Sequence, residues 1–213
     1  MSEIRRRRRW PWIVGAILLV VLVPVAIIVV PIVTHQSQGL SYQEDAAEQW
    51  PTSVTATGDD GRMRELMVVA PEPGGELDTS ALEPGDRLVV SGSGYDGSRG
   101  IYVAICVVPD DPATKPGPCI GGVPDQQQET VDAGTVQFAP SNWINDDWAW
   151  KLFGARSYDD VASGTFTAYI EVGDPVGDGF DCTAQKCGLF TRNDHTALAD
   201  RVQDLYIPVA FAR

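Results

Sequence analysis

The sequence predicts an all-β fold, an antiparallel sandwich of seven strands, preceded by one transmembrane helix. Ile13 to Val33 is an uncharged run of 21 residues, long enough to cross the ~30 Å hydrocarbon core as a helix. From Ser53 onward, short runs rich in β-branched and aromatic residues alternate with Gly, Pro and Asp, which is typical of strands and turns. No run after residue 33 keeps a helical period.

The residues around the apolar run predict its orientation. Arg5 to Arg9 precede it, and Trp10 and Trp12 stand at its start, where indoles favour the headgroup layer. Residues 1–12 are therefore expected to be a cytoplasmic basic tail, and 13–33 a single-pass signal-anchor in the cell membrane. The alternative is a cleaved signal peptide, whose apolar region is usually ~7–15 residues and ends at small residues. Residues 34–38 make a poor cleavage site, and no Cys stands directly after the run, which excludes a lipoprotein anchor.

After the helix, residues 34–52 are polar and are expected to be a juxtamembrane tether, with a short helix around Tyr42 to Trp50 as the alternative, and residues 53–213 an extracytoplasmic domain. Seven strands are expected in it, at 64–69, 87–91, 101–108, 134–138, 164–172, 187–191 and 205–211. Phe166, Ala168 and Ile170 alternate with polar residues, the pattern of a half-buried strand. Pro208 cannot donate a ladder hydrogen bond, so the last strand is expected at an edge or to be bulged.

The charge distribution excludes nucleic acid as a partner. The chain has 16 basic and 29 acidic residues. Five of the bases are Arg5–Arg9 and one of the acids is Glu3, so the part after the helix holds 11 bases and 28 acids, a net charge of −17. Such a body repels phosphate backbones.

Four cysteines lie after the helix: Cys106, Cys119, Cys182 and Cys187. An even number in a translocated domain implies two disulfides, with three possible connectivities. An antibody-type Cys106–Cys182 bridge would be accompanied by a core Trp soon after the first Cys, and the next Trp is Trp143. Spacing therefore favours the local pairs Cys106–Cys119 and Cys182–Cys187. Zinc is the alternative, but the spacing is not C-x-x-C and the only histidines are His35 and His195.

Several segments carry a family resemblance: VVSGSGY at 89–95, GIYVAIC at 100–106, PC at 118–119, DCTAQKC at 181–187 and IPVAF at 207–211. Over roughly residues 64–213 the chain resembles the neocarzinostatin-type apoproteins of actinomycetes. The resemblance implies an immunoglobulin-like sandwich with both disulfides local. In the drug-carrying members, a cleft beside the disulfide loops holds an apolar chromophore, which makes Val108 and Phe180 candidate cleft residues here.

An insertion at residues 139–163 gathers aromatic side chains. Trp143, Trp148, Trp150, Phe153 and Tyr158 lie within sixteen residues and are candidate partner-binding residues, because Trp and Tyr often anchor interfaces. The alternative is a lid that packs its aromatics on a sheet face.

The sequence gives little support for a metal site or for catalytic activity. Acidic loops such as Asp174, Asp178 and Asp181 could hold calcium, but no stretch follows an EF-hand pattern. Asp194–His195 invites a catalytic interpretation, yet no G-x-S-x-G elbow is present. We therefore expect neither an enzyme nor a cofactor or metal.

The expected function is that of a membrane-anchored accessory module. It would bind other membrane or envelope proteins, as a non-catalytic subunit of an envelope or respiratory membrane complex. The alternative is a carrier of a small apolar ligand in the cleft, and an uncharacterised hydrolase ranks last.

Overall fold

The structure is a computed structural model that describes residues 10–44, 48–122 and 136–212. The predicted basic run Arg5–Arg9 lies outside these residues. The chain divides into two compact units, residues 1–35 and 36–213. We call the second unit the β-domain.

The first unit contains the helix α1 (Trp10–Thr34), which has 25 residues and extends slightly beyond the predicted run at both ends. It is the one helix in the described part of the chain that is long and apolar enough to span a membrane. At 1.5 Å per residue its length is about 37 Å, more than the ~30 Å hydrocarbon core.

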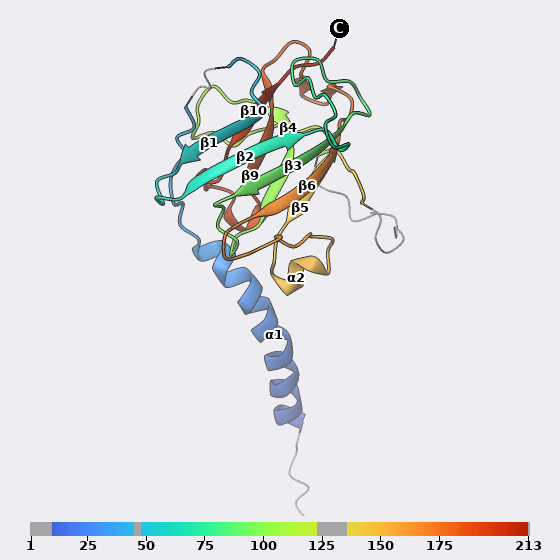
Figure 1. The fold of residues 1–213 in the computed structure, drawn as a ribbon. Helices are drawn as coiled ribbons and strands as arrows, with labels where there is room; N and C mark the ends of the chain where they lie inside the picture. Colours follow the sequence, from blue (N-terminus) through green and yellow to red (C-terminus); the bar gives the residue numbers. More distant parts are fainter. Residues whose placement is uncertain (1–9, 45–47, 123–135, 213) are drawn as a thin grey trace, which may run out of the picture. The chain divides into compact units, whose positions relative to one another are not determined.

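The β-domain is mainly β, and its paired strands are antiparallel (Figure 1). One sheet has the order β1 (Ser53–Thr57), β2 (Met63–Val69), β3 (Arg87–Ser93) and β6 (Phe166–Glu171). The other has the order β10 (Tyr206–Val209), β9 (Cys187–Asn193), β4 (Ile101–Val107) and β5 (Ser141–Ile144). A small hairpin joins β7 (Val176–Gly177) to β8 (Phe180–Asp181), and the short helices are α2 (Trp148–Lys151) and the 3₁₀ turn η1 (His195–Ala197).

Both four-stranded sheets contribute side chains to one hydrophobic core. On β6, Phe166, Ala168 and Ile170 are buried and alternate with partly exposed residues, which confirms the predicted alternation. The ring of Phe166 meets that of Tyr95 edge to face, with centroids 5.1 Å apart. Strands of both sheets therefore pack through the faces that the sequence marks as apolar.

Six of the seven predicted strands are present, and the prediction for 134–138 is wrong where the structure describes it. Residues 136–138 form no strand, while 134 and 135 lie outside the described residues. The ring of Phe138 packs on Tyr169, with centroids 5.5 Å apart, and on the Arg87 guanidinium at 5.0 Å. The strand in this region is β5, within the predicted insertion at 139–163, and it pairs with β4.

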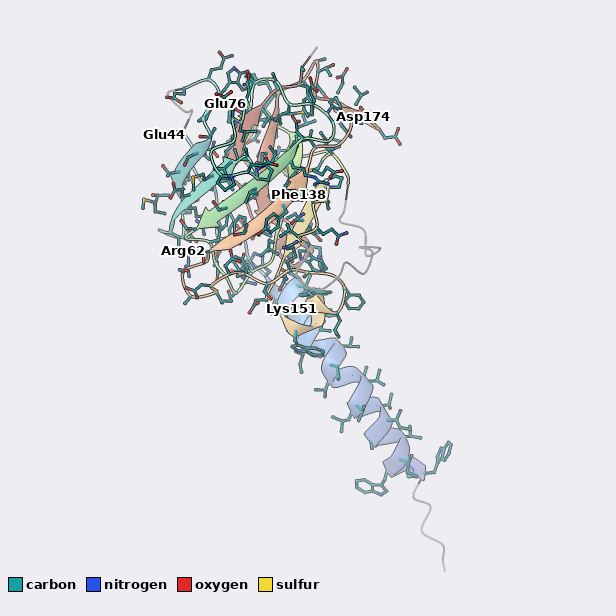
Figure 2. The ribbon with its side chains drawn as sticks, turned by 45° about the vertical axis from the view of Figure 1, so that its right-hand side comes forward. Glu44, Arg62, Glu76, Phe138, Lys151 and Asp174 are labelled. Carbon is teal, nitrogen blue, oxygen red and sulfur yellow. A yellow bond between two sulfur atoms is a disulfide. The ribbon has the colours of Figure 1, made fainter. Side chains whose placement is uncertain are left out.

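The strands define two ends of the β-domain. At the α2 end, Ile101 of β4 lies opposite Ile144 and Asn193. At the disulfide end, Val107 pairs with Cys187, which pairs with Val209. Figure 2 shows Arg62 and Lys151 toward the α2 end and Glu76 and Asp174 toward the disulfide end.

Strand β10 is an edge strand, as Pro208 predicted. The backbone hydrogen-bonding groups on its outer edge are largely occupied. The Gln43 side chain accepts from Tyr206 N and donates to Tyr206 O, both at 2.7 Å. Pro208 has no N–H to offer, and Ala210 bonds to Thr79 and Leu82. Such protection prevents an edge from pairing with other chains.

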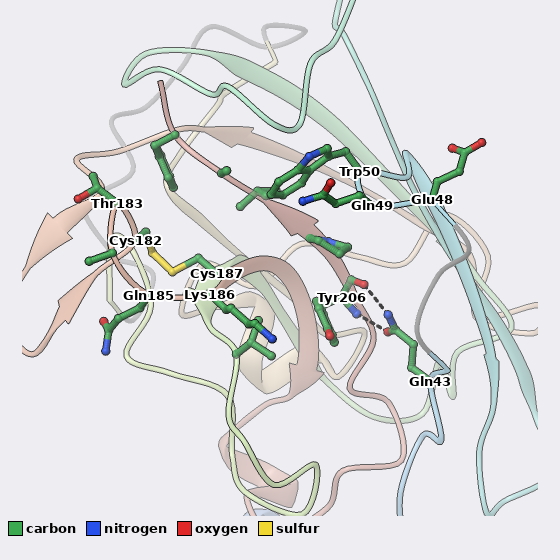
Figure 3. Close-up of a pocket in the computed structure, with 16 residues that line it drawn as sticks. Gln43, Glu48, Gln49, Trp50, Cys182, Thr183, Gln185, Lys186, Cys187 and Tyr206 are labelled. Carbon is green, nitrogen blue, oxygen red and sulfur yellow. Dashed lines mark hydrogen bonds between the residues drawn. A yellow bond between two sulfur atoms is a disulfide. The ribbon is translucent and has the colours of Figure 1, made fainter. Parts of the chain in front are cut away.

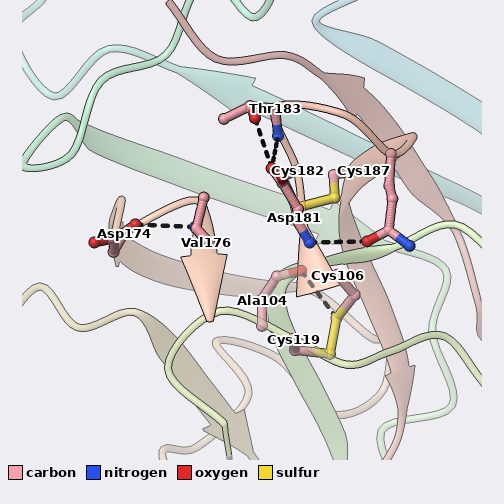
Figure 4. Close-up of a disulfide and its surroundings, with 10 residues drawn as sticks. Ala104, Cys106, Cys119, Asp174, Val176, Asp181, Cys182, Thr183 and Cys187 are labelled. Atoms are coloured by element: carbon pink, nitrogen blue, oxygen red, sulfur yellow. Dashed lines mark hydrogen bonds between the residues drawn. A yellow bond between two sulfur atoms is a disulfide. The ribbon is translucent and has the colours of Figure 1, made fainter. Parts of the chain in front are cut away.

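Both predicted local disulfides are confirmed, Cys106–Cys119 and Cys182–Cys187. They lie together at the disulfide end, near β7 and β8 (Figure 4). Disulfides are typical of oxidising, extracytoplasmic compartments.

Candidate functional site

The main candidate site is a groove beside the Cys182–Cys187 disulfide (Figure 3). Its volume is ≈ 500 Å³. The groove runs from the end of β10 to the loop 182–187, with Trp50 on one side. A hollow of this size lies within the range of ligand-binding pockets.

The groove combines an apolar floor with polar side chains. The apolar members are Trp50, Val108, Tyr206, Pro208, Val209, Ala210, Phe211 and the disulfide itself. The polar members are Gln43, Glu48, Gln49, Thr183, Gln185 and Lys186. Such a lining can bind an apolar group and hydrogen-bond to amides or carbonyls around it.

Local hydrogen bonds fix the shape of the loop that bounds the groove. The Asp181 carboxylate accepts from the Thr183 N–H at 2.9 Å and from the Thr183 hydroxyl at 2.6 Å (Figure 4). The Gln185 amide oxygen accepts from Asp181 N at 2.8 Å. These hydroxyl and backbone donors lower the pKa of Asp181. The loop is therefore held by short-range bonds as well as by its disulfide.

A second hollow of ≈ 530 Å³ adjoins the first and shares Gln43, Val108 and Tyr206 with it. Its wall includes Phe190, whose ring stacks on Tyr206 with centroids 4.7 Å apart. Leu40 to Glu44 line its other side. The two hollows follow β10, and residues of the predicted tether form part of both.

The structure separates the two predicted cleft residues. Val108 lines both hollows along β10. Phe180 instead lines a third hollow of ≈ 550 Å³, together with Cys119 and Arg192. The two candidate residues of the cleft beside the disulfide loops therefore line different hollows.

The aromatic residues of the insertion divide into three groups. Tyr158 is buried in the core, where its hydroxyl donates to Arg99 O at 2.9 Å. Trp143 and Trp150 are partly buried and surround His195, with ring centroids 5.2 and 4.6 Å from the imidazole. Trp148 and Phe153 are 69% and 50% exposed. Of the five candidates, these two have the largest surface for a partner.

Asp194 and His195 have separate partners. Asp194 accepts from Trp143 Nε1 at 2.8 Å and Asn145 Nδ2 at 2.9 Å, and its other oxygen accepts from Thr196. The Nδ1 atom of His195 lies 2.9 Å from the Tyr102 hydroxyl. Burial, followed by the charge of Asp194, raises the pKa of Tyr102 to about 12, so its hydroxyl stays protonated at neutral pH. These hydrogen bonds of Asp194 cap the turn at η1 and hold the insertion in place.

The acidic loops have a structural explanation. At least ten of the aspartates that the structure describes accept a hydrogen bond from the backbone N–H two residues further on: Asp60, Asp78, Asp96, Asp111, Asp147, Asp160, Asp174, Asp181, Asp194 and Asp200. This is the Asx-turn, which fixes tight turns. Among the residues with described positions, no group of three or more His, Cys, Asp or Glu side chains could hold a metal ion.

No protein-family model matches the chain, and neither the curated proteins nor the solved structures contain a match.

Sequence reasoning missed Gln43, Trp50 and Phe211 as groove residues. Gln43 and Trp50 belong to the predicted tether at 34–52, yet Gln43 is bonded to β10. A large aromatic such as Trp50 in a polar segment was the available signal, since an indole is seldom left fully in water.

Proposed function

We propose that this protein is a membrane-anchored, extracytoplasmic binding module without catalytic activity. It acts as an accessory subunit of an envelope or respiratory membrane complex. Its β-domain is an immunoglobulin-like sandwich of the neocarzinostatin type. The shared core of the two sheets and the two local disulfides support that architecture.

In the proposed orientation of the chain, the N-terminus lies in the cytoplasm. The basic run Arg5–Arg9 before the apolar helix supports it, because such runs stay on the cytoplasmic side. The disulfides support it too, since they form where the environment is oxidising. An anchor raises the effective concentration of the β-domain near partners in the same membrane.

The groove along β10 is the observation that carries the binding role. It is open at the disulfide end, and it combines an apolar floor with amide side chains at its margin. A segment of a partner protein presents both an apolar side chain and backbone amides. We therefore place such a segment in the groove.

A small apolar ligand is the second candidate occupant. The volume of ≈ 500 Å³ is enclosed partly by Trp50, Phe211 and the disulfide, and mostly apolar hollows of this size suit small molecules. A carrier would hold this ligand without any protein partner.

The orientation predicts that the disulfide end is accessible from outside the cell. A cysteine introduced at Val176, which is 51% exposed on β7, should react with a membrane-impermeant maleimide in intact cells. A cysteine placed in the N-terminal tail at Ser2 should react only after lysis. The reverse pattern would overturn the orientation.

The groove predicts site-specific cross-linking in native membranes. A photo-activatable residue at Ala184, an exposed member of the groove wall, should yield an adduct of discrete mass. The same residue at Met67, exposed on β2 of the other sheet, is the control and should yield none.

The mass of the adduct distinguishes the two occupants. A gain of several kilodaltons or more, with peptides of one envelope protein, identifies a protein segment. A gain of a few hundred daltons identifies a small ligand. Equal labelling at Ala184 and Met67 would contradict a binding role for the groove.

A further inference from the structure

Large apolar side chains are exposed together at the α2 end of the β-domain. Leu152 is 74%, Trp148 69%, Leu198 52% and Phe153 50% exposed. Trp148 belongs to α2, and Leu152 and Phe153 follow it directly. Leu198 follows η1, whose His195 ring packs on Trp150 of α2. We call these four residues the apolar cap. Exposed apolar side chains gathered at one end of a domain mark a candidate interaction site.

The apolar cap is built on a fixed support. Asp147 caps the N-terminus of α2 by accepting from Ala149 N at 2.9 Å. After α2, Gly154 has a φ of 94° and donates to Lys151 O, while Ala155 donates to Trp150 O. These are the two bonds of a Schellman motif, which needs a left-handed residue. The cap is therefore an ordered surface.

The chain enters the β-domain at this same end. The backbone carbonyl of Gly39 accepts from Arg201 N, and Leu40 exchanges two hydrogen bonds with Asp59. Arg201 lies between η1 and β10, and Asp59 lies in the β1–β2 turn. Both residues lie at the α2 end of the β-domain.

Only residues 35–38 separate the last residue of α1, Thr34, from Gly39. The five Cα-to-Cα steps between them reach at most about 18 Å. A 25-residue helix is longer than the hydrocarbon core, so it ends in the headgroup layer. A chain this short keeps the point of entry within about 18 Å of the end of α1, and this point belongs to the α2 end of the β-domain.

We propose that the apolar cap inserts into the headgroup layer of the bilayer in which α1 is anchored. This inference rests on the membrane anchoring of the proposed function. The β-domain thereby has a second attachment to the membrane and a fixed orientation. The groove at the disulfide end then points away from the bilayer, toward partners that project from it.

The side chains of the cap suit a zwitterionic lipid surface. Trp favours the boundary between headgroups and hydrocarbon, and Phe and Leu supply the buried apolar face of elements that lie in this layer. The only lysine of α2, Lys151, is paired with Asp146 at 2.7 Å, and Asp59, Asp60 and Asp147 lie at the same end. Because Lys151 is paired and further acids lie at this end, contact depends on apolar insertion and needs no anionic lipid.

Depth-dependent quenching tests the inference on the full-length chain. Single cysteines at Leu152, Leu198, Val176 and Val21 are each labelled with an environment-sensitive dye. The chain is reconstituted in phosphatidylcholine vesicles, at fewer than one chain per vesicle to exclude contact between copies. Some vesicles carry lipids with a nitroxide near the headgroup, and others carry lipids with a nitroxide deep in the acyl chain, at the depth of Val21 in the middle of α1. Val176 is the matched control, because it is as exposed as Leu198 but lies at the disulfide end.

We expect the nitroxide lipids to quench the dye at Leu152 and Leu198 severalfold more than the dye at Val176. Val21, within α1, reports on anchoring alone. Quenching at Val21 with none at Leu152 and Leu198 would overturn the lipid contact and leave the anchor standing. No quenching at Val21 would overturn the anchor, and the inference with it. Protection of Leu152 in native membranes but not in pure lipid would assign the cap to a protein partner and would also overturn the inference.

Discussion

Replacing Asp194 with alanine is expected to lower the free energy of unfolding by about 3–5 kcal/mol, because each buried donor left without an acceptor costs about 1–3 kcal/mol. The Asp194 side chain is fully buried. Its two carboxylate oxygens accept from Trp143 Nε1, Asn145 Nδ2, and the Thr196 N–H and hydroxyl. Alanine would leave all four donors without this acceptor, and the position of the carboxylate itself is fully buried.

The packing around Asp194 leaves no room for a side chain at position 100. A Cβ atom on Gly100 would lie 1.8 Å from the Asp194 carboxylate. Gly100 is therefore needed for the close approach of the carboxylate to the start of β4. Trp143 and Asn145 lie on β5 and just after it, so the network also fixes the insertion that carries α2.

Urea unfolding of residues 36–213 measures this loss, and Asp160→Ala is the matched control. Asp160 accepts from Ala162 N and from the Ser163 hydroxyl, but it is exposed. Its loss should cost only about 1 kcal/mol, as for other exposed caps. Equal costs for the two replacements would show that the buried network adds nothing beyond a cap.

Alternating burial made β6 predictable, whereas β1 alternates as well but was missed, because its five residues, SVTAT, are short and mostly small or polar. In β6 the apolar residues point inward at every second position, and this pattern depends on adjacent residues only. In β4, six of seven residues are buried, which gives a continuous apolar run that is just as visible. Strand β5 was missed because it has four residues, SNWI, of which two are polar. Asn142 is buried because its amide bonds to the backbone of Tyr169, a partner that the local sequence does not reveal.

The groove and the sorting of the aromatics depend on contacts between distant segments. Gln43 and Tyr206 are 163 positions apart. Trp143 is partly buried because of Asp194, 51 residues away. Trp148 and Trp150 have the same chemistry, and only the direction of a four-residue helix decides which one packs on His195. No spacing rule contains this information, whereas the disulfides were predictable because their loops are local.

The many acidic residues of the β-domain suggested metal-binding sites, but many of its aspartates stabilise turns. Many of its aspartates are followed two positions later by a residue whose N–H they accept, as in Asp78–Ser80 and Asp181–Thr183. The hydroxyls of Ser80 and Thr183 donate to the same carboxylates. The pattern D-x-S/T was therefore an available signal for turns.

Raising the pH from 4.5 to 7.5 is expected to lower the free energy of unfolding through Asp204. Burial raises the pKa of this carboxyl to about 6, although the Arg201 guanidinium at 2.7 Å opposes the rise. A carboxyl with a raised pKa in the folded state favours its protonated form there. Its contribution to stability is complete below the unfolded pKa and is lost as the pH rises through about 6. For a shift of about two pH units, the loss approaches ~3 kcal/mol.

Other aspartates act in a different pH range, which makes the effect of Asp204 separable. For Asp60, burial opposes ionisation, but the hydrogen bonds and charge of Arg64 outweigh it and lower the pKa. The stabilisation from Asp60 is present above the unfolded pKa near 4 and is lost only at lower pH. Between pH 4.5 and 7.5 the decline should therefore belong mainly to Asp204. Urea unfolding of residues 36–213 at several pH values measures it, with Asp204→Asn as the comparison. The asparagine variant leaves Arg201 with a neutral partner, so its absolute stability is not the readout. Its stability should change less over this range than that of the unmodified chain, and the same decline in both would rule out Asp204 as the source.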